Sequence, residues 1–151
     1  MNKLPLTDQD TVLFTKIVKK INFFASMNMG LMEKILNRIY YYQYDSGEKV
    51  CKQGDIGDAF YVIAEGRLKV SIREAFLFSR TLATLGPGDC FGEMALLESK
   101  PRNATVTCEE PSKIFVLTSE HFDQALAENP SFKQEIKKLA ADRQFEIDHK
   151  K

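Results

Sequence analysis

Residues 91–106 read FGEMALLESKPRNATV, and the interpretation of the whole chain starts from this stretch. Its apolar beginning and its β-branched end fit two strands, and Glu93–Leu97 between them is typical of a short helix. Gly92 stands where the first strand gives way to the helix, and Arg102 stands just before the second strand. The stretch therefore predicts strand, short helix and strand, with a glycine and an arginine at the two junctions.

These junctions have the chemistry of an anion site. The first turn of a helix leaves backbone N–H groups unpaired and partly positive, and Gly92 lets an anion approach them closely. Arg102 adds a full positive charge with two-pronged hydrogen bonding, and Glu93 can accept from a sugar hydroxyl. Either half alone could equally be structural, with Glu93 and Arg102 as a surface ion pair. Together they predict a site for a phosphate beside a sugar.

On both sides of this stretch the chain has the sequence pattern of an antiparallel sheet. From residue 40 to residue 117, short β-branched and aromatic runs alternate with glycine-bearing turns at a spacing of about 8–12 residues. This pattern favours a sandwich or roll. The clearest predicted strands are Phe60–Ala64, Arg67–Arg73, Arg80–Leu85, Ala104–Cys108 and Lys113–Leu117.

Helices are expected at both ends of this β region. An apolar stripe from Phe14 to Phe24 predicts one helix, and Asn28 is a candidate cap for a second that runs through Leu31–Ile39. Thr118 or Ser119 can cap a C-terminal helix, and Pro130 opens the last one.

The expected architecture is one domain of mainly-β α+β class. It spans residues 1–151 and consists of an N-terminal helical segment (1–39), a jelly-roll-like antiparallel β-roll (40–117) and C-terminal hinge or lid helices (118–148).

Composition excludes several classes of function. Lysine plus arginine and aspartate plus glutamate each total 21, so the formal net charge is zero and no basic excess indicates nucleic acid. No window approaches the roughly 18 apolar residues of a membrane span. Met1–Leu6 has no apolar segment of the kind that signal peptides carry. We therefore expect no membrane segment.

The reactive side chains do not form a catalytic or metal constellation. Cys51, Cys90 and Cys108 are widely spaced and form no C-x-x-C pair, which fits reduced thiols in a cytoplasmic protein. His121 and His149 are the only histidines, so a multi-histidine metal site cannot be built. No nucleophile, base and acid set is visible. We expect no cofactor, no metal and no enzymatic activity.

The run at residues 91–106 resembles the phosphate-binding cassette of the cyclic-nucleotide-binding domain family. Its fixed pattern is FGExAL, a short spacer and PRxATV, and each fixed position is present. Residues 47–66, GEKVCKQGDIGDAFYVIAEG, are similar to a second family signature. The resemblance implies that this stretch builds turns rather than the site. The GPGD at residues 86–89 also fits, and the resemblance extends from about Ile21 to Arg143.

The resemblance implies a role for each cassette residue. The backbone amides of Met94 and Ala95, after Gly92, would hold the cyclic phosphate of cAMP or cGMP. Glu93 would bond the ribose 2′-hydroxyl, and Arg102 would pair with an exocyclic phosphate oxygen. The predicted ligand site comprises Gly92, Glu93, Met94, Ala95, Arg102, Asn103 and Ala104.

The base half of the ligand is less defined. Relatives with threonine or serine at the place of Asn103 often favour cGMP, and those with alanine often favour cAMP. The amide oxygen of Asn103 could accept from the guanine amino group, which leaves cGMP open. We favour cAMP because it is the commoner ligand of such domains. Arg143 could stack on the purine as a lid, or be one charge on a solvated helix end. Leu82 is a weaker candidate for lining the base pocket.

The family implies a sensor in which ligand binding shifts the position of the last helix. The alternative is a structural or interaction domain of the same fold that has lost its ligand. A protein effector and a homodimer are the other expected partners, with no DNA-binding domain in this chain, which ends at Lys151. Whether the chain is free-standing or cut from something larger stays open.

Overall fold

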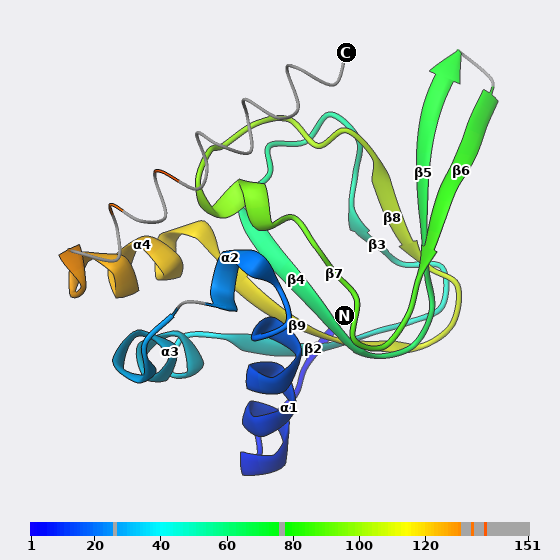
Figure 1. Cartoon of the computed structure of the whole chain (residues 1–151). Coiled ribbons are helices and arrows are strands. Elements are labelled where there is room, and N and C mark those ends of the chain that lie inside the picture. The colour runs from blue at the N-terminus through cyan, green and yellow to red at the C-terminus, as the bar shows by residue number, and fades with distance from the viewer. Residues whose placement is uncertain (26, 76–77, 131–133, 135–137, 139–151) are drawn as a thin grey trace.

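The computed structural model describes residues 1–25, 27–75, 78–130, 134 and 138. Two antiparallel sheets form the body of the molecule, as Figure 1 shows. The five-stranded sheet has the order β1 (Asn2–Lys3), β2 (Tyr40–Tyr44), β9 (Ser112–Thr118), β4 (Ala59–Glu65) and β7 (Cys90–Phe91). The four-stranded sheet has the order β3 (Lys49–Cys51), β8 (Thr105–Cys108), β5 (Leu68–Ala75) and β6 (Phe78–Leu85). The predicted mainly-β roll flanked by helices is confirmed.

Strand β4 is buried on both faces, which explains why its sequence is a continuous apolar run rather than an alternating one. Phe60 and Val62 face a core beneath the helices, whereas Tyr61 and Ile63 face a second core between the sheets. The paired strand β9 divides its side chains between the same two cores. Because the two sides of one strand belong to different cores, β4 joins the helical layer to the rest of the roll.

The helices cover one side of the five-stranded sheet, and the β5–β6 hairpin stands on the other side (Figure 1). They are α1 (Asp8–Val18), α2 (Asn22–Ala25), α3 (Met29–Leu36) and α4 (Ser119–Ala127). Aromatic rings anchor this layer to the sheet. Phe14 meets Phe115 with ring centroids 5.4 Å apart, and Phe24 meets Phe60 at 5.1 Å.

The prediction of one helix from Phe14 to Phe24 was wrong, because α1 ends at Val18 and α2 begins at Asn22. The N–H of Lys20 donates to the carbonyl oxygen of Ile17, and the N–H of Ile21 donates to that of Val18. Because these hydrogen bonds span three residues instead of four, they tighten the last turn and end α1. The break brings two aromatic side chains of this segment against different strands of the sheet.

The segment 1–39 also contains a short strand that the sequence did not predict. Asn2 and Lys3 form β1, which pairs with Gln43 and Tyr42 of β2. A strand of two residues is too short to show a period of its own.

Asn28 caps α3 as predicted: its Oδ1 accepts from the backbone N–H of Leu31 at 2.8 Å. We expect Asn28→Ala to lower the free energy of unfolding by about 1 kcal/mol, because one N–H of the first turn loses its acceptor. Urea unfolding measures the change. Asn37→Ala is the matched control, since Asn37 ends the same helix and its side chain makes no hydrogen bond within the described part of the chain. Equal losses in both variants would contradict the capping role.

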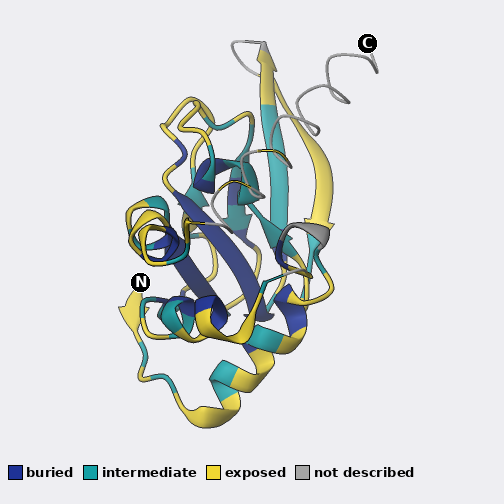
Figure 2. Cartoon of the chain, turned by 60° about the vertical axis from the view of Figure 1, so that its left-hand side comes forward, coloured by how far each residue is buried: buried dark blue, intermediate teal, exposed yellow. Residues whose placement is uncertain are grey.

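Strand β6 forms one edge of the four-stranded sheet and is exposed along nearly its whole length (Figure 2). Phe78 keeps 72% of its surface accessible and Leu82 keeps 49%. Among the described residues, no helix has the length and apolar character needed to cross a membrane.

Candidate functional site

Gly92 turns the chain from β7 into the short 3-10 helix η1 (Glu93–Leu96). Strand β7 is fixed by its pairing with β4, where Phe91 lies opposite Tyr61. Gly92 has φ +87°, a conformation that L side chains rarely adopt. A Cβ here would lie 2.6 Å from Nη1 of Arg102 and 2.8 Å from the carbonyl oxygen of Ala59. Glycine is therefore required by both the turn and the close approach of Arg102.

The backbone of η1 offers fewer unpaired donors than the sequence predicted. The N–H of Ala95 donates to the carbonyl oxygen of Gly92 at 3.0 Å, because the 3-10 turn closes its bonds over three residues. The N–H of Met94 has no acceptor among the described residues. Met94 thus offers an anion a whole donor, whereas Ala95 would have to share one.

The side chain of Arg102 runs between two glycines into the roll. Its Nη2 donates to the carbonyl oxygen of Ala59 at 2.6 Å. A Cβ on Gly57 would lie 3.0 Å from Nε of Arg102, and a Cβ on Gly92 would lie 2.6 Å from Nη1 at the other end of the side chain. The main chain of Arg102 is also held, because its N–H donates to the carbonyl oxygen of Asp55 at 2.7 Å.

An aromatic stack supports the guanidinium. Its Cζ lies 5.6 Å from the ring centroid of Tyr61, a cation–π distance, and Tyr61 stacks on Phe91 at 4.8 Å. Burial raises the pKa of the Tyr61 hydroxyl and of the Cys51 thiol, and in both cases the Arg102 charge opposes the rise. No carboxylate of the described residues lies within 4.0 Å of the guanidinium, so its charge acts on these neighbours without an ion pair.

A cavity of about 380 Å³ opens between η1 and the chain around Arg102. It brings together five predicted site residues: Gly92, Met94, Ala95, Arg102 and Asn103. Glu93 and Ala104 are partly buried nearby in the sequence but are not among the described lining residues. Lys100 also lines the cavity, with its ammonium 3.3 Å from the Glu98 carboxylate. Arg102 therefore dominates the local charge.

The interpretation that residues 47–66 build turns rather than the site was wrong at Gly57 and Tyr61. Both residues contact the Arg102 side chain. The N–H of Gly57 donates to the carbonyl oxygen of Lys100 at 2.8 Å, and Ile56 forms a bridge with Pro101. The repeated glycines were a visible signal, but nothing in the sequence shows which distant side chain a glycine makes room for.

The structure does not test the predicted lid. Arg143 and most of the last predicted helix lie outside the described residues. The helix before it is present, and Thr118 is its cap, with Oγ1 accepting from the N–H of His121 at 3.2 Å. Leu82, the weaker candidate for the base, does not line the 380 Å³ cavity.

The chain matches the profile of a known protein family. The family profile described as "Cyclic nucleotide-binding domain" matches residues 42–129, more than half of the chain. The chain belongs to this family. In this cyclic nucleotide-binding domain, the matched region includes β4, which contacts Arg102, its partner strand β7, and the whole of η1.

This cyclic nucleotide-binding domain is similar to parts of larger proteins. It is 32% identical over 111 residues to the cGMP-dependent protein kinase of Toxoplasma gondii, covering 74% of this chain and 11% of that protein. It is 30% identical over 132 residues to the cAMP-dependent protein kinase type II regulatory subunit of Drosophila melanogaster, covering 87% of this chain and 34% of that protein. The chain thus spans about a third or less of these relatives.

The same architecture occurs in a solved bacterial structure, the N-terminal domain of a transcriptional regulator from Streptomyces coelicolor A3(2). The two share a TM-score of 0.76 at 22% identity, over 89% of this chain and 93% of that one. At this level of identity the comparison supports the fold alone.

Proposed function

We propose that this domain is a regulatory module that binds a cyclic nucleotide in the cavity beside η1. Arg102 pairs with an exocyclic phosphate oxygen, and the amides of Met94 and Ala95 hold the phosphate from the other side. Glu93 accepts from the ribose 2′-hydroxyl, while Gly92, Asn103 and Ala104 shape the pocket. The module performs no catalysis, and its three free cysteines fit the reducing cytoplasm.

The observation that carries this proposal is the placement of Arg102. A guanidinium without a carboxylate partner in the described residues is held rigid by two glycines, a carbonyl and an aromatic ring. Holding it in advance lowers the entropic cost of ligand binding. A phosphate would supply the missing negative charge with charge-assisted hydrogen bonds.

For the base, we propose cAMP as the preferred ligand and cGMP as the alternative. Asn103 is exposed at the mouth of the cavity, where its amide can donate or accept. Arg143 as a stacking lid stays a prediction, as do a protein effector and a homodimer.

We also propose that ligand binding is coupled to the C-terminal helices. Leu96 of η1 belongs to the same core cluster as Phe122 and Leu126 of α4. A shift of η1 on binding would therefore change the packing of α4. Slower hydrogen exchange in α4 with saturating cAMP would support the coupling, and unchanged exchange would contradict it.

Calorimetric titration of the purified domain tests the function itself. We expect one site per chain for cAMP, weaker binding of cGMP, and little binding of 5′-AMP, whose open phosphate has a different shape and an additional charge. If neither cyclic nucleotide binds, the alternative of a ligand-free structural domain holds.

Gly57→Ala tests whether this glycine makes room for Arg102. The added methyl would press on Nε at 3.0 Å and on the Lys100 carbonyl oxygen at 3.2 Å, so the guanidinium must shift. We expect cAMP affinity to fall about tenfold, which is about 1.4 kcal/mol. Gly86→Ala is the control, because its Cβ would meet nothing closer than 4.0 Å. Unchanged affinity in Gly57→Ala would contradict the positioning role.

A further inference from the structure

A second cavity, of about 550 Å³, lies on the four-stranded sheet. It shares no described lining residue with the cavity beside η1. Three cations and three hydroxyls line it: Lys49, Lys52, Arg73, Ser71, Ser79 and Thr105. None of its described lining residues is acidic.

The strand register places this cavity on the outer face of the sheet. Val70 and Val106 are directly paired and belong to the core between the sheets. The next pair, Ser71 and Thr105, therefore points to the opposite face, because side chains alternate along a strand. Arg73 is paired with Ser79 and continues the polar face toward the hairpin. The hydroxyls thus come from three neighbouring strands and lie on one surface.

Among the described residues, the three cations lack the carboxylate partners that six other cations have. No carboxylate of the described residues lies within 4.0 Å of Lys49, Lys52 or Arg73. Glutamates lie within that distance of the described cations Lys34, Arg38, Arg67, Arg80, Lys100 and Lys113. Since the chain has no net charge, the concentration of positive charge in this cavity is local.

Gln53 fixes the cavity wall. Its backbone N–H donates to Oγ1 of Thr105 at 2.9 Å, and its Oε1 accepts from the backbone N–H of Arg73 at 2.7 Å. Its Nε2 donates to the carbonyl oxygen of Arg73 at 3.5 Å. The amide therefore pairs with β5 as a neighbouring strand would, beyond the point where β8 begins. This pairing holds the Lys52 loop against the strand that carries Arg73.

We propose that this cavity binds a small anion that carries two or more phosphate groups, of which inorganic pyrophosphate is the simplest. Clustered ammonium and guanidinium groups neutralise such an anion, and serine and threonine hydroxyls donate to its oxygens. An acidic peptide fits less well, because Gln53 already occupies the N–H and carbonyl of Arg73 with which an added strand would pair.

Calorimetry with inorganic pyrophosphate tests this proposal on the whole chain. We expect one site per chain, with inorganic monophosphate at least tenfold weaker. Arg73→Ala and Lys52→Ala should each weaken pyrophosphate binding at least tenfold, because each removes one of three cations. Lys20→Ala is the control, since Lys20 is exposed and does not line the cavity, and it should leave affinity unchanged.

Other results would overturn the proposal. Absence of pyrophosphate binding would do so, as would equal losses in Lys20→Ala and Arg73→Ala. Displacement of pyrophosphate by cAMP, or loss of its binding in Arg102→Ala, would place the anion at the cavity beside η1 instead. Tighter binding of hexaglutamate than of pyrophosphate would favour an acidic peptide. Since cAMP and pyrophosphate are titrated separately, failure of one proposal leaves the other tested.

Discussion

Replacing Arg102 by alanine is expected to weaken cAMP binding at least a hundredfold, which corresponds to about 2.7 kcal/mol. The guanidinium is the dominant charge in the 380 Å³ cavity, and no described carboxylate neutralises it. Truncation removes a charge-assisted pair to the phosphate and leaves a desolvated anion without its partner. Calorimetric titration of the variant beside the unmodified chain measures the loss.

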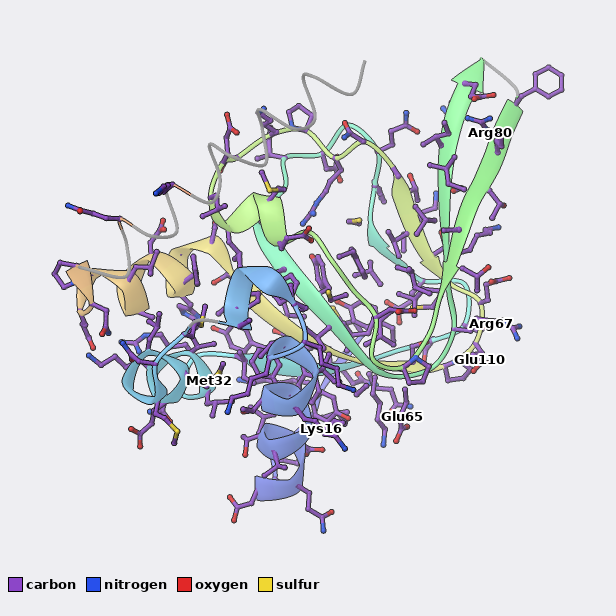
Figure 3. The ribbon with its side chains drawn as sticks, in the orientation of Figure 1. Lys16, Met32, Glu65, Arg67, Arg80 and Glu110 are labelled. Carbon is purple, nitrogen blue, oxygen red and sulfur yellow. The ribbon has the colours of Figure 1, made fainter. Side chains whose placement is uncertain are left out.

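Arg67→Ala is the matched control for this experiment. Arg67 lies just before the start of β5 and beside Glu110, at the end of the strand that is far from Arg80 (Figure 3). It is 55% exposed and pairs only at the surface, so its loss should leave cAMP affinity unchanged. Arg102→Lys should fall between the two, because lysine keeps the charge but loses the planar fork that lies over Tyr61. Unweakened binding by Arg102→Ala would remove Arg102 from the proposed site.

Gly66→Ala is expected to have the largest effect on stability. Gly66 joins β4 to β5 with φ +112°, and a Cβ there would lie 2.5 Å from Cβ of Ser112 and 2.7 Å from its Cα. Ser112 is 1% exposed at the start of β9 and cannot move away freely. We expect a loss of about 3 kcal/mol from strain and overlap combined, a drop of roughly 10 °C in melting temperature. Calorimetric melting measures it.

Gly47→Ala separates backbone strain from overlap. Gly47 also has a positive φ, +88°, but a Cβ there would meet nothing within 4 Å. It should cost only about 1 kcal/mol. If the two variants lose equal stability, contact with Ser112 is not the cause of the larger loss expected for Gly66→Ala.

The sequence predicted those helices and strands that are long enough to show a hydrophobic pattern. The apolar runs at Phe60–Ala64 and Lys113–Leu117 proved to be β4 and β9. These runs were easy to see because a strand buried on both faces needs uninterrupted apolar residues. Strands β1 and β3 have two and three residues and were not predicted, because so few positions carry no periodicity. The strand predicted to end before Gly92 proved to be β7, which has only two residues. The break between α1 and α2 was missed because the apolar spacing continues across it.

For the site, the sequence identified the residues of the cassette but not how they are held. The Phe-Gly-Glu and Pro-Arg segments indicated Gly92 and Arg102, and both line one cavity. The support of Arg102 by Gly57, Ala59 and Tyr61 depends on contacts across more than forty positions, such as the 43 that separate Arg102 from Ala59. No local pattern encodes such a contact. The engaged N–H of Ala95 depends on η1 being a 3-10 helix, which spacing alone does not distinguish from an α-helix.

The double burial of β4 has a consequence for how the molecule unfolds. One side of this strand completes the core under the helices and the other completes the core between the sheets. Detaching the helical layer would expose Phe60 and Val62 to water and remove the support for the side that carries Tyr61 and Ile63. We therefore expect the two cores to unfold in a single cooperative transition rather than in succession. The strand that contacts Arg102 would be among the last to open its amides to exchange.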